Sequence, residues 1–265
     1  MSAVGIIPAR YGSTRLPAKA LATLGGIPLI QHVYQQARKA TQLTDVVVAT
    51  DDERIVRVVA GFGGRAIMTD ARHRSGTDRV AEVARQRDEQ VILNIQGDEP
   101  LIHPDQIDQV AACLLAHRAV PMATVMTRLT HPDDATNPNV VKVVVDQDGY
   151  ALYFSRSPIP FVRNHEGSRL KVEGSRPEQF PSTSNVQPRT FFKHIGLYGY
   201  QREFLLRFPS LAQTPLEQAE QLEQLRALEH GHKIRVLETT HDTIGVDTAD
   251  DLKRVEQLLA GAVGR

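Results

Sequence analysis

The first half of the chain alternates short runs of apolar, mostly β-branched residues with segments whose apolar residues recur at helical spacing. The runs AVGIIPA, DVVVATD, AIMT and VILNIQ occupy residues 3–9, 45–51, 66–69 and 91–96, and each is followed by a helical pattern. Strands that are apolar along their whole length are buried on both faces, and strands separated by helices pair in parallel. The pattern therefore predicts an α/β fold with a doubly wound, mostly parallel central sheet and helices on both faces.

The second half of the chain departs from this alternation. Residues 140–156, VVKVVVDQDGYALYFSR, read as two strands around an Asp-Gly turn, which predicts an antiparallel hairpin inserted into the fold. Residues 160–192 are polar and rich in Pro, Ser, Asn and Arg, so we expect a long loop, and long loops in compact domains are commonly functional. Strand patterns return at HIGLYGY, residues 194–200, and at KIRVLET, residues 233–239.

Two further helices are expected near the end of the chain. The segment 215–231 has Thr214 as its N-cap, proline in its first turn, leucines at helical spacing and a closing Gly231, so it predicts one continuous helix. Residues 248–261, TADDLKRVEQLLAG, predict a final amphipathic helix. Because neither internal repeats nor low-complexity segments interrupt the pattern, residues 1–265 are interpreted as a single domain.

Charge and cysteine content exclude several classes of protein. The chain has 31 basic and 31 acidic residues, so no overall field favours nucleic acid or an anionic membrane. Cys113 is the only cysteine, which excludes an intramolecular disulfide and a zinc site built on several thiolates. No apolar run approaches the roughly 20 residues of a membrane span, and the N-terminus does not resemble a signal peptide. We therefore expect a cytoplasmic protein without nucleic-acid or membrane partners.

Chemically capable side chains follow nearly every predicted strand. These clusters lie at residues 10–19, 50–53, 72–79, 96–100 and 245–247. Ligands of open α/β sheets bind beyond the carboxyl ends of the strands, so nearly all of these clusters are expected at one edge of the sheet.

The first cluster lies in IIPARYGSTRLPAKAL, residues 6–21, which combines turn residues with Arg10, Arg15 and Lys19. Backbone N–H groups and three cations suit phosphate oxygens. The stretch lacks both GxxxxGK[ST] and GxGxxG, which argues against a P-loop NTPase and against a Rossmann dinucleotide site. A solvated basic loop is the alternative.

Two aspartates follow buried strands and could hold a metal ion. Asp98 comes directly after NIQG, and Asp247 follows another strand. Mg²⁺ prefers one or two carboxylates together with substrate phosphates. The alternatives are a turn aspartate at Asp98 and a helix N-cap at Asp247.

Ser75, Gly76 and Thr77 are expected at a helix N-terminus, where N–H groups could recognise a base edge or an anion, or where the serine is simply a cap. The histidines show neither HExxH nor a close pair at helical spacing, so a histidine metal cluster is not expected. A G-x-S-x-G elbow is also missing, which argues against Ser13 or Ser155 as an acylating nucleophile.

Eight blocks of the sequence together resemble the CMP-KDO synthetases, the 3-deoxy-manno-octulosonate cytidylyltransferases of the nucleotidyltransferase superfamily. The blocks are IIPARYGSTRLPAKAL, VATDDERI, HRSGTDRVAEV, NIQGDEP, YFSRSPIP, HIGLYGY, PLEQAEQLEQLRAL and GVDTADDL. They occur in the family's order and extend almost from end to end. The resemblance implies the nucleotide-diphospho-sugar transferase type of fold, in which the hairpin insertion serves dimerisation.

The resemblance also implies roles for individual residues. The triphosphate of CTP would be held by Arg10, Ser13, Arg15 and Lys19. Cytosine and ribose would lie near Arg74, Ser75, Gly76 and Thr77. Mg²⁺ would be held by Asp98 and Asp247, and the sugar acid would face Gln96, Arg156, His194, Tyr198, Glu220 and Gln224. The residues expected to act in catalysis are Lys19, Arg10 and Asp98.

For the whole chain, the resemblance implies transfer of CMP from CTP to 3-deoxy-manno-octulosonate (KDO) for lipopolysaccharide synthesis, with a homodimer as the assembly. Residues 1–130 would form the nucleotide-binding half, 131–245 the sugar-binding and dimerisation half, and 246–265 a closing helix. The opening motif departs from the family's usual form at Gly12, where alanine is common, and at Ala18, where glycine is common. Both changes replace one small residue by another.

Two other functions remain open on the sequence. A different sugar acid, such as 8-amino-KDO or a sialic acid, could be the acceptor, because the sequence does not distinguish between sugar acids that differ by a single substituent. A non-catalytic nucleotide-binding protein could keep this fold, but it would be expected to lose Lys19 or the acidic pair.

Overall fold

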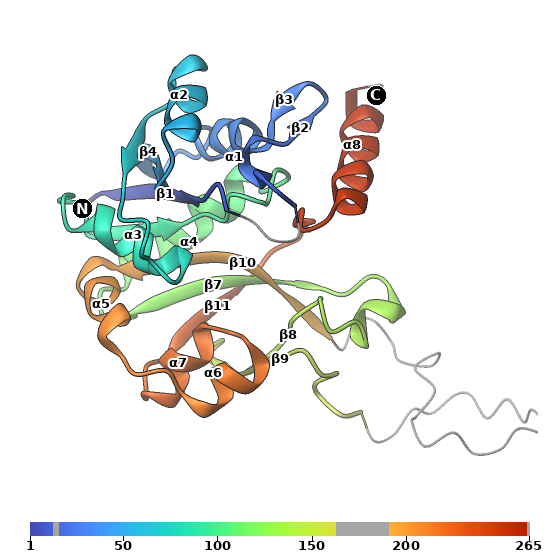
Figure 1. The fold of residues 1–265 in the computed structure, drawn as a ribbon. Coiled ribbons are helices and arrows are strands. Elements are labelled where there is room, and N and C mark those ends of the chain that lie inside the picture. The colour runs from blue at the N-terminus through green and yellow to red at the C-terminus, as the bar shows by residue number, and fades with distance from the viewer. Residues whose placement is uncertain (13–15, 163–190, 264–265) are drawn as a thin grey trace, which may run out of the picture.

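The computed structural model describes residues 1–12, 16–162 and 191–263, with side chains described as far as residue 259 (Figure 1). Within this part of the chain a nine-stranded sheet has the order β11-β7-β10-β6-β1-β4-β5, and β8 and β9 join it beside β10. The strands are β1 Ala3–Ala9, β4 Leu43–Thr50, β5 Ala66–Met68, β6 Val91–Asn94, β7 Met122–Arg128, β8 Lys142–Val145, β9 Ala151–Ser155, β10 Phe192–Gln201 and β11 Ile234–Glu238. A separate two-stranded sheet pairs β2 Thr23–Leu24 with β3 Ile27–Pro28.

Along the path β11-β7-β10-β6-β1-β4-β5, four of the six neighbouring pairs are parallel, as predicted, whereas β8 is antiparallel to both β10 and β9. β1 pairs in parallel with β4 and with β6, β4 with β5, and β7 with β11. β10 reverses the direction, because it is antiparallel to both β6 and β7. The β7 strand was not predicted, since its sequence MATVMTR mixes methionine, alanine and threonine in place of a continuous β-branched run.

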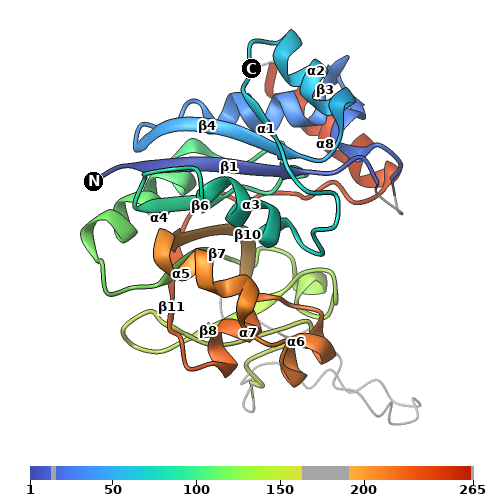
Figure 2. The same ribbon diagram turned by 60° about the vertical axis from the view of Figure 1, so that its left-hand side comes forward.

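Helices cover both faces of the sheet, which confirms the doubly wound prediction (Figures 1 and 2). The helices are α1 Leu29–Ala37, α2 Glu53–Gly61, α3 Gly76–Ala84, α4 Pro104–Ala116, α5 Arg202–Arg207, α6 Pro215–Glu220, α7 Gln224–Glu229 and α8 Ala249–Val263. Apolar residues of α1, α2 and α4 pack into one buried cluster, and those of α3, α5 and α7 pack into a second cluster on the opposite face. Short 3₁₀ helices occur at Lys19–Leu21, Pro132–Ala135 and Phe208–Ser210.

The predicted antiparallel hairpin is present as β8 and β9, with Gly149 in its turn at φ +74°. That positive φ explains the glycine, because side chains with a Cβ rarely adopt it. Lys142 of β8 is fully buried, and its ammonium donates to the backbone carbonyls of Asn137, Val140 and Arg156 at 2.9, 2.5 and 2.6 Å. These three hydrogen bonds tie both ends of the hairpin to the preceding loop.

The prediction of one continuous helix over residues 215–231 is wrong. The segment forms α6 and α7, separated by a break at Gln221, which has the left-handed φ of +53°. The break lets Glu220 face the β8–β9 hairpin while Glu223 faces α3, where they accept hydrogen bonds from Ser155 and Thr77. A straight helix would place residues three apart on one face.

The last helix, α8, packs on the β2–β3 sheet rather than on the large sheet (Figure 1). Leu24 and Leu29 form a small buried cluster there with Val246 and Val255. The connection between β11 and α8 therefore runs along the edge of the sheet toward the N-terminal segments. Among the described helices, none is long and apolar enough to cross a bilayer.

Candidate active site

A cleft of about 340 Å³ opens at the edge of the sheet where β1 and β6 end. Its walls come from the segments after these two strands, from the start of α3 and from the connection before α8. The predicted site residues that line it are Arg10, Lys19, Arg74, Ser75, Gly76, Gln96, Asp98 and Asp247. Ser13 and Arg15 lie outside the described residues.

Lys19 connects the two candidate metal ligands. Its Nζ lies 2.5 Å from Oδ2 of Asp98 and 3.0 Å from Oδ1 of Asp247. Burial lowers the pKa of Lys19, but attraction to Asp98 and hydrogen bonds to both carboxylates outweigh it, so its pKa is raised. The lysine is therefore a stable cation between two converging carboxylates.

The backbone brings Asp98 and Asp247 together. The N–H of Val246 donates to the carbonyl oxygen of Asp98 at 2.8 Å, which joins the last connection to the loop after β6. Gly97 allows that loop to lie against β1, because a Cβ there would come within 2.8 Å of the Pro8 carbonyl oxygen.

The cap of α8 is made by residues other than Asp247. The hydroxyl of Thr248 accepts from the N–H of Asp251 at 3.2 Å, and Oδ2 of Asp251 accepts from the N–H groups of Thr248 and Asp247 at 2.8 and 3.1 Å. This capping box satisfies the first turn of the helix. The Asp247 carboxylate faces Lys19 instead, which favours the metal-ligand interpretation over the N-cap alternative.

The start of α3 is compatible with both interpretations made from its sequence, the helix cap and the ligand-binding N-terminus. Ser75 caps the helix, since its Oγ accepts from the N–H of Asp78 at 3.0 Å, and it also lines the cleft. Gly76 allows close packing, because a Cβ there would lie 3.3 Å from Cγ of Pro8. Thr77 is buried and donates its hydroxyl hydrogen bond to Glu223, away from the cleft.

Glu223 is a site residue that the sequence did not reveal. In a continuous helix it would look like an ordinary solvated acid, but the break before α7 directs it beneath Ser75 and Thr77. Burial raises the pKa of Glu223, partly offset by the hydrogen bond from Thr77 and by the charge of Arg226. The carboxylate thus connects the cleft wall to the residues expected around the sugar.

The expected sugar-binding residues lie between β10, α7 and the hairpin, and Gln96 alone of them lines the cleft. His194 is buried beside Tyr198, with ring centroids 5.2 Å apart, and its Nε2 lies 3.0 Å from the hydroxyl of Thr124. Burial lowers the pKa of His194 to about 3, so the imidazole is uncharged at neutral pH. It therefore lacks the positive charge that would attract a sugar carboxylate.

Arg156 and Glu220 are bound to each other. Nε of Arg156 donates to the Glu220 carbonyl oxygen at 2.7 Å, and Oε2 of Glu220 accepts from the Arg156 backbone N–H at 2.9 Å. Gln224 is different: within the described part of the chain, its buried Nε2 has no hydrogen-bond partner. A buried donor without an acceptor is costly, so Gln224 is the residue of this group whose amide most needs a ligand oxygen.

Comparison with known proteins finds similar sequences. A model of the cytidylyltransferase family matches residues 4–234. A 3-deoxy-manno-octulosonate cytidylyltransferase of Geobacter sulfurreducens is 51% identical over 259 residues, covering 98% of this chain and 100% of the relative. One of Solibacter usitatus with the same name is 47% identical over 260 residues, covering 98% of this chain and 95% of the relative.

Solved structures show the same architecture. A CMP:2-keto-3-deoxy-manno-octonic acid synthetase complexed with CTP superposes with a TM-score of 0.86 at 41% identity, covering 99% of this chain and all of that one. A cytidylyltransferase from Leptospira borgpetersenii, at 14% identity and a TM-score of 0.60, shares the fold; 98% of this chain and 87% of that one are covered.

The residue before Lys19 suggests a stabilising substitution. Ala18 has φ +51°, a left-handed conformation that costs a residue with a Cβ about 1–2 kcal/mol. We expect Ala18→Gly to raise the free energy of unfolding by about 0.5 kcal/mol, since glycine's added chain entropy offsets part of the relieved strain. Urea denaturation measures the change.

Ala22 provides the matched control for this substitution, because it follows the same 3₁₀ turn but has φ −58°. Ala22→Gly should lower the free energy of unfolding by about 0.5–1 kcal/mol. Equal destabilisation by both substitutions would contradict the strain assigned to Ala18.

Proposed function

The chain belongs to the cytidylyltransferase family, and we propose that it transfers CMP from CTP to KDO, giving CMP-KDO and pyrophosphate. The observation that carries the proposal is the convergence of Lys19, Asp98 and Asp247 at the mouth of a basic cleft. The choice of KDO is supported by relatives that are named 3-deoxy-manno-octulosonate cytidylyltransferases. Their sequences are 51% and 47% identical to this one over nearly the whole chain.

The cleft is suited to a nucleoside triphosphate. Arg10, Lys19 and Arg74 line it, and guanidinium and ammonium groups form strong, charge-assisted hydrogen bonds to phosphate oxygens. We assign the triphosphate to Arg10 and Lys19, and the cytidine to the wall made by Arg74, Ser75 and Gly76. The α3 N-terminus adds its positive dipole end on that wall.

Asp98 and Asp247 have the donor set of a magnesium site. Their carboxylates converge on one ammonium, so their oxygens already face a common cation position. Mg²⁺ binds one or two carboxylates and completes its shell with water and substrate phosphates. When bound, the ion supplies charge neutralisation at the phosphates and lowers the pKa of a coordinated hydroxyl.

In the proposed reaction, the anomeric hydroxyl oxygen of KDO attacks the α-phosphorus of CTP in line. The new O–P bond forms as the bond between the α-phosphorus and the pyrophosphate oxygen breaks. Pyrophosphate leaves with that electron pair, and the proton of the hydroxyl passes to solvent water. Lys19 and Arg10 neutralise the negative charge that spreads over the phosphate oxygens, which is the main task of a protein in phosphoryl transfer. Lys19 is held beside Asp98 before substrate arrives, and its high pKa keeps it charged for this role.

The acceptor sugar is placed against Gln96, Tyr198 and Gln224. The unpartnered amide of Gln224 favours a ligand rich in acceptor oxygens, as a polyhydroxy acid is. Arg156, Glu220 and His194 are proposed to shape this region, because their polar groups are already engaged with the protein.

A pyrophosphate-release assay with CTP and a panel of sugar acids tests the proposal. KDO should give the highest kcat/KM, above both 8-amino-KDO and a sialic acid. If the protein clearly prefers either analogue, that analogue replaces KDO as the proposed substrate. CTP binding by calorimetry without pyrophosphate release from any acid would favour a non-catalytic nucleotide-binding protein.

Substitutions at the charged centre separate catalysis from stability. Lys19→Ala and Asp98→Asn should each lower kcat by about 10²-fold or more, because each removes a charge that acts at the reacting phosphate. Their melting temperatures should stay close to that of the parent, since neither side chain is in the apolar core. Pyrophosphate release and thermal unfolding provide the two measurements.

Lys39→Ala is the control for these substitutions, because Lys39 is exposed and hydrogen-bonded only to Gln36 among the described contacts. It should retain parental turnover. Near-parental activity in Lys19→Ala or Asp98→Asn would remove that residue from the catalytic assignment.

We also propose that the chain forms a homodimer through its hairpin. Among the described strands, only β8 forms a ladder with β9, and the residue before β9, Tyr150, makes an isolated bridge to Arg235 of β11. Leu152 of β9 is 62% exposed and Phe161, beyond the hairpin, is 78% exposed. Large exposed apolar side chains on and beside a strand at the end of a sheet are typical of a surface covered by another chain.

Leu152→Asp should shift the protein toward the monomer in analytical ultracentrifugation, because it buries a charge in the proposed interface. Leu258→Asp is the control, since Leu258 is also exposed, at 48%, but lies on α8. If both variants sediment like the parent dimer, the interface lies elsewhere. A monomeric parent would remove the proposal.

We place the reaction in the cytoplasm, where CTP is available, as an activation step for lipopolysaccharide synthesis. This placement rests on the substrate proposed above.

A further inference from the structure

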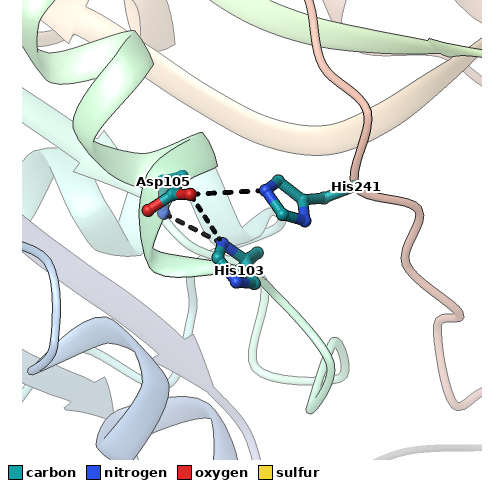
Figure 3. A group of neighbouring side chains, drawn as sticks. All are labelled: His103, Asp105 and His241. Carbon is teal, nitrogen blue, oxygen red and sulfur yellow. Dashed lines mark hydrogen bonds and ion pairs between the residues drawn. The ribbon is translucent and has the colours of Figure 1, made fainter.

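Two histidines and an aspartate meet on the protein outside the cleft (Figure 3). His103 and Asp105 lie at the N-terminus of α4, and His241 lies on the connection between β11 and α8. Nδ1 of His103 and Nε2 of His241 face the same carboxylate oxygen of Asp105, at 3.5 and 3.4 Å. The sequence led us to expect no histidine cluster, because these histidines are far apart along the chain.

A buried glutamine holds the two histidine segments in place. The side chain of Gln106 is fully buried; its Oε1 accepts from the N–H of His103 at 3.0 Å and its Nε2 donates to the carbonyl oxygen of His241 at 3.1 Å. The imidazole rings lie stacked, with centroids 3.6 Å apart and planes 6° from parallel. The backbone of the cluster is therefore fixed before any ligand arrives.

We propose that His103, Asp105 and His241 bind a divalent transition-metal ion such as Zn²⁺. One ligand atom from each residue lies within 4.8 Å of the others. Ligands about 2.0–2.1 Å from zinc in a tetrahedral shell are about 3.4 Å apart, close to the two distances measured from Asp105. Imidazole nitrogens select zinc and its neighbours rather than Mg²⁺, which prefers oxygen.

Three features of the cluster oppose binding. Nδ1 of His103 accepts a hydrogen bond from the backbone N–H of Asp105 at 3.3 Å as the cap of α4, and a metal ion would have to displace that bond. The rings must tilt out of their stack for their lone pairs to meet at one ion. The N-terminus of α4 also carries a partial positive charge, which opposes a cation at this end of the helix. The carboxylate of Asp105 lies in the same helical turn and offsets that charge.

A metal ion at this site would hold together the two segments that carry Asp98 and Asp247 of the cleft. Asp98 lies shortly before His103, and Asp247 lies shortly after His241. These segments are already joined by the Val246–Asp98 backbone bond and by the hydrogen bond from Thr243 to Glu99 at 2.6 Å. The hydrogen bond from Gln106 to the His241 carbonyl oxygen is a third connection, and a metal ion would add a fourth, so we assign it a structural role that stabilises this junction.

Zinc titration by calorimetry tests the site, using a chain without a histidine tag and millimolar Mg²⁺ to occupy the acidic pair. The parent should bind one Zn²⁺ per chain and gain melting temperature. His241→Gln and Asp105→Asn should each weaken zinc binding about tenfold or more and lose the gain in melting temperature, because each removes a ligand. Co²⁺ should give an absorption spectrum typical of nitrogen and oxygen ligands in the parent but not in these two variants.

His117→Gln is the matched control, since His117 is exposed at the opposite end of α4. It should bind zinc like the parent, and so should Asp98→Asn, which alters the cleft but not the histidine cluster. No saturable zinc binding, or equal binding by His241→Gln and the parent, would overturn the proposal. Loss of binding in Asp98→Asn alone would place the zinc in the cleft instead.

Discussion

The backbone hydrogen bond from Val246 to Asp98, 2.8 Å long, is the junction on which the candidate active site depends. It joins the loop after β6, in the middle of the sheet, to the last connection of the chain. Lys19 comes from a third segment, after β1, and its two salt bridges are possible only because that junction brings Asp98 beside Asp247. The site is built from three loops, and its geometry is set by one main-chain contact and by the parallel pairing of β1 with β6.

The sequence predicted this edge because strand ends follow a simple rule. Apolar runs identified β1 and β6, and the carboxyl ends of parallel strands meet at one edge, so Arg10, Lys19 and Asp98 had to be neighbours. The interpretation of Asp247 could not be decided from the sequence. The same Asp-Thr dipeptide suits a helix cap, and only the structure shows the cap at Thr248 and Asp251.

Other features depend on contacts between residues that are far apart in the sequence, and local sequence patterns do not reveal such contacts. The break at Gln221 contradicts a strong local helix signal, because the buried Glu217–Arg226 pair and the contact from Thr77 to Glu223 outweigh propensity. β7 carries no distinctive run and becomes a strand because β10 and β11 pair with it on either side. Tertiary contacts decide these elements.

Electrostatics connects the site to its proposed substrate. Lys19, Asp98 and Asp247 together carry one net negative charge, so by themselves they repel a triphosphate. A divalent ion held by the carboxylates would reverse that sign and would leave the ammonium of Lys19 to bind phosphate oxygens. In the proposed function, therefore, the metal ion would let the acidic side of the cleft accept the triphosphate. The lysine serves until then as the counter-ion that keeps two facing carboxylates in position.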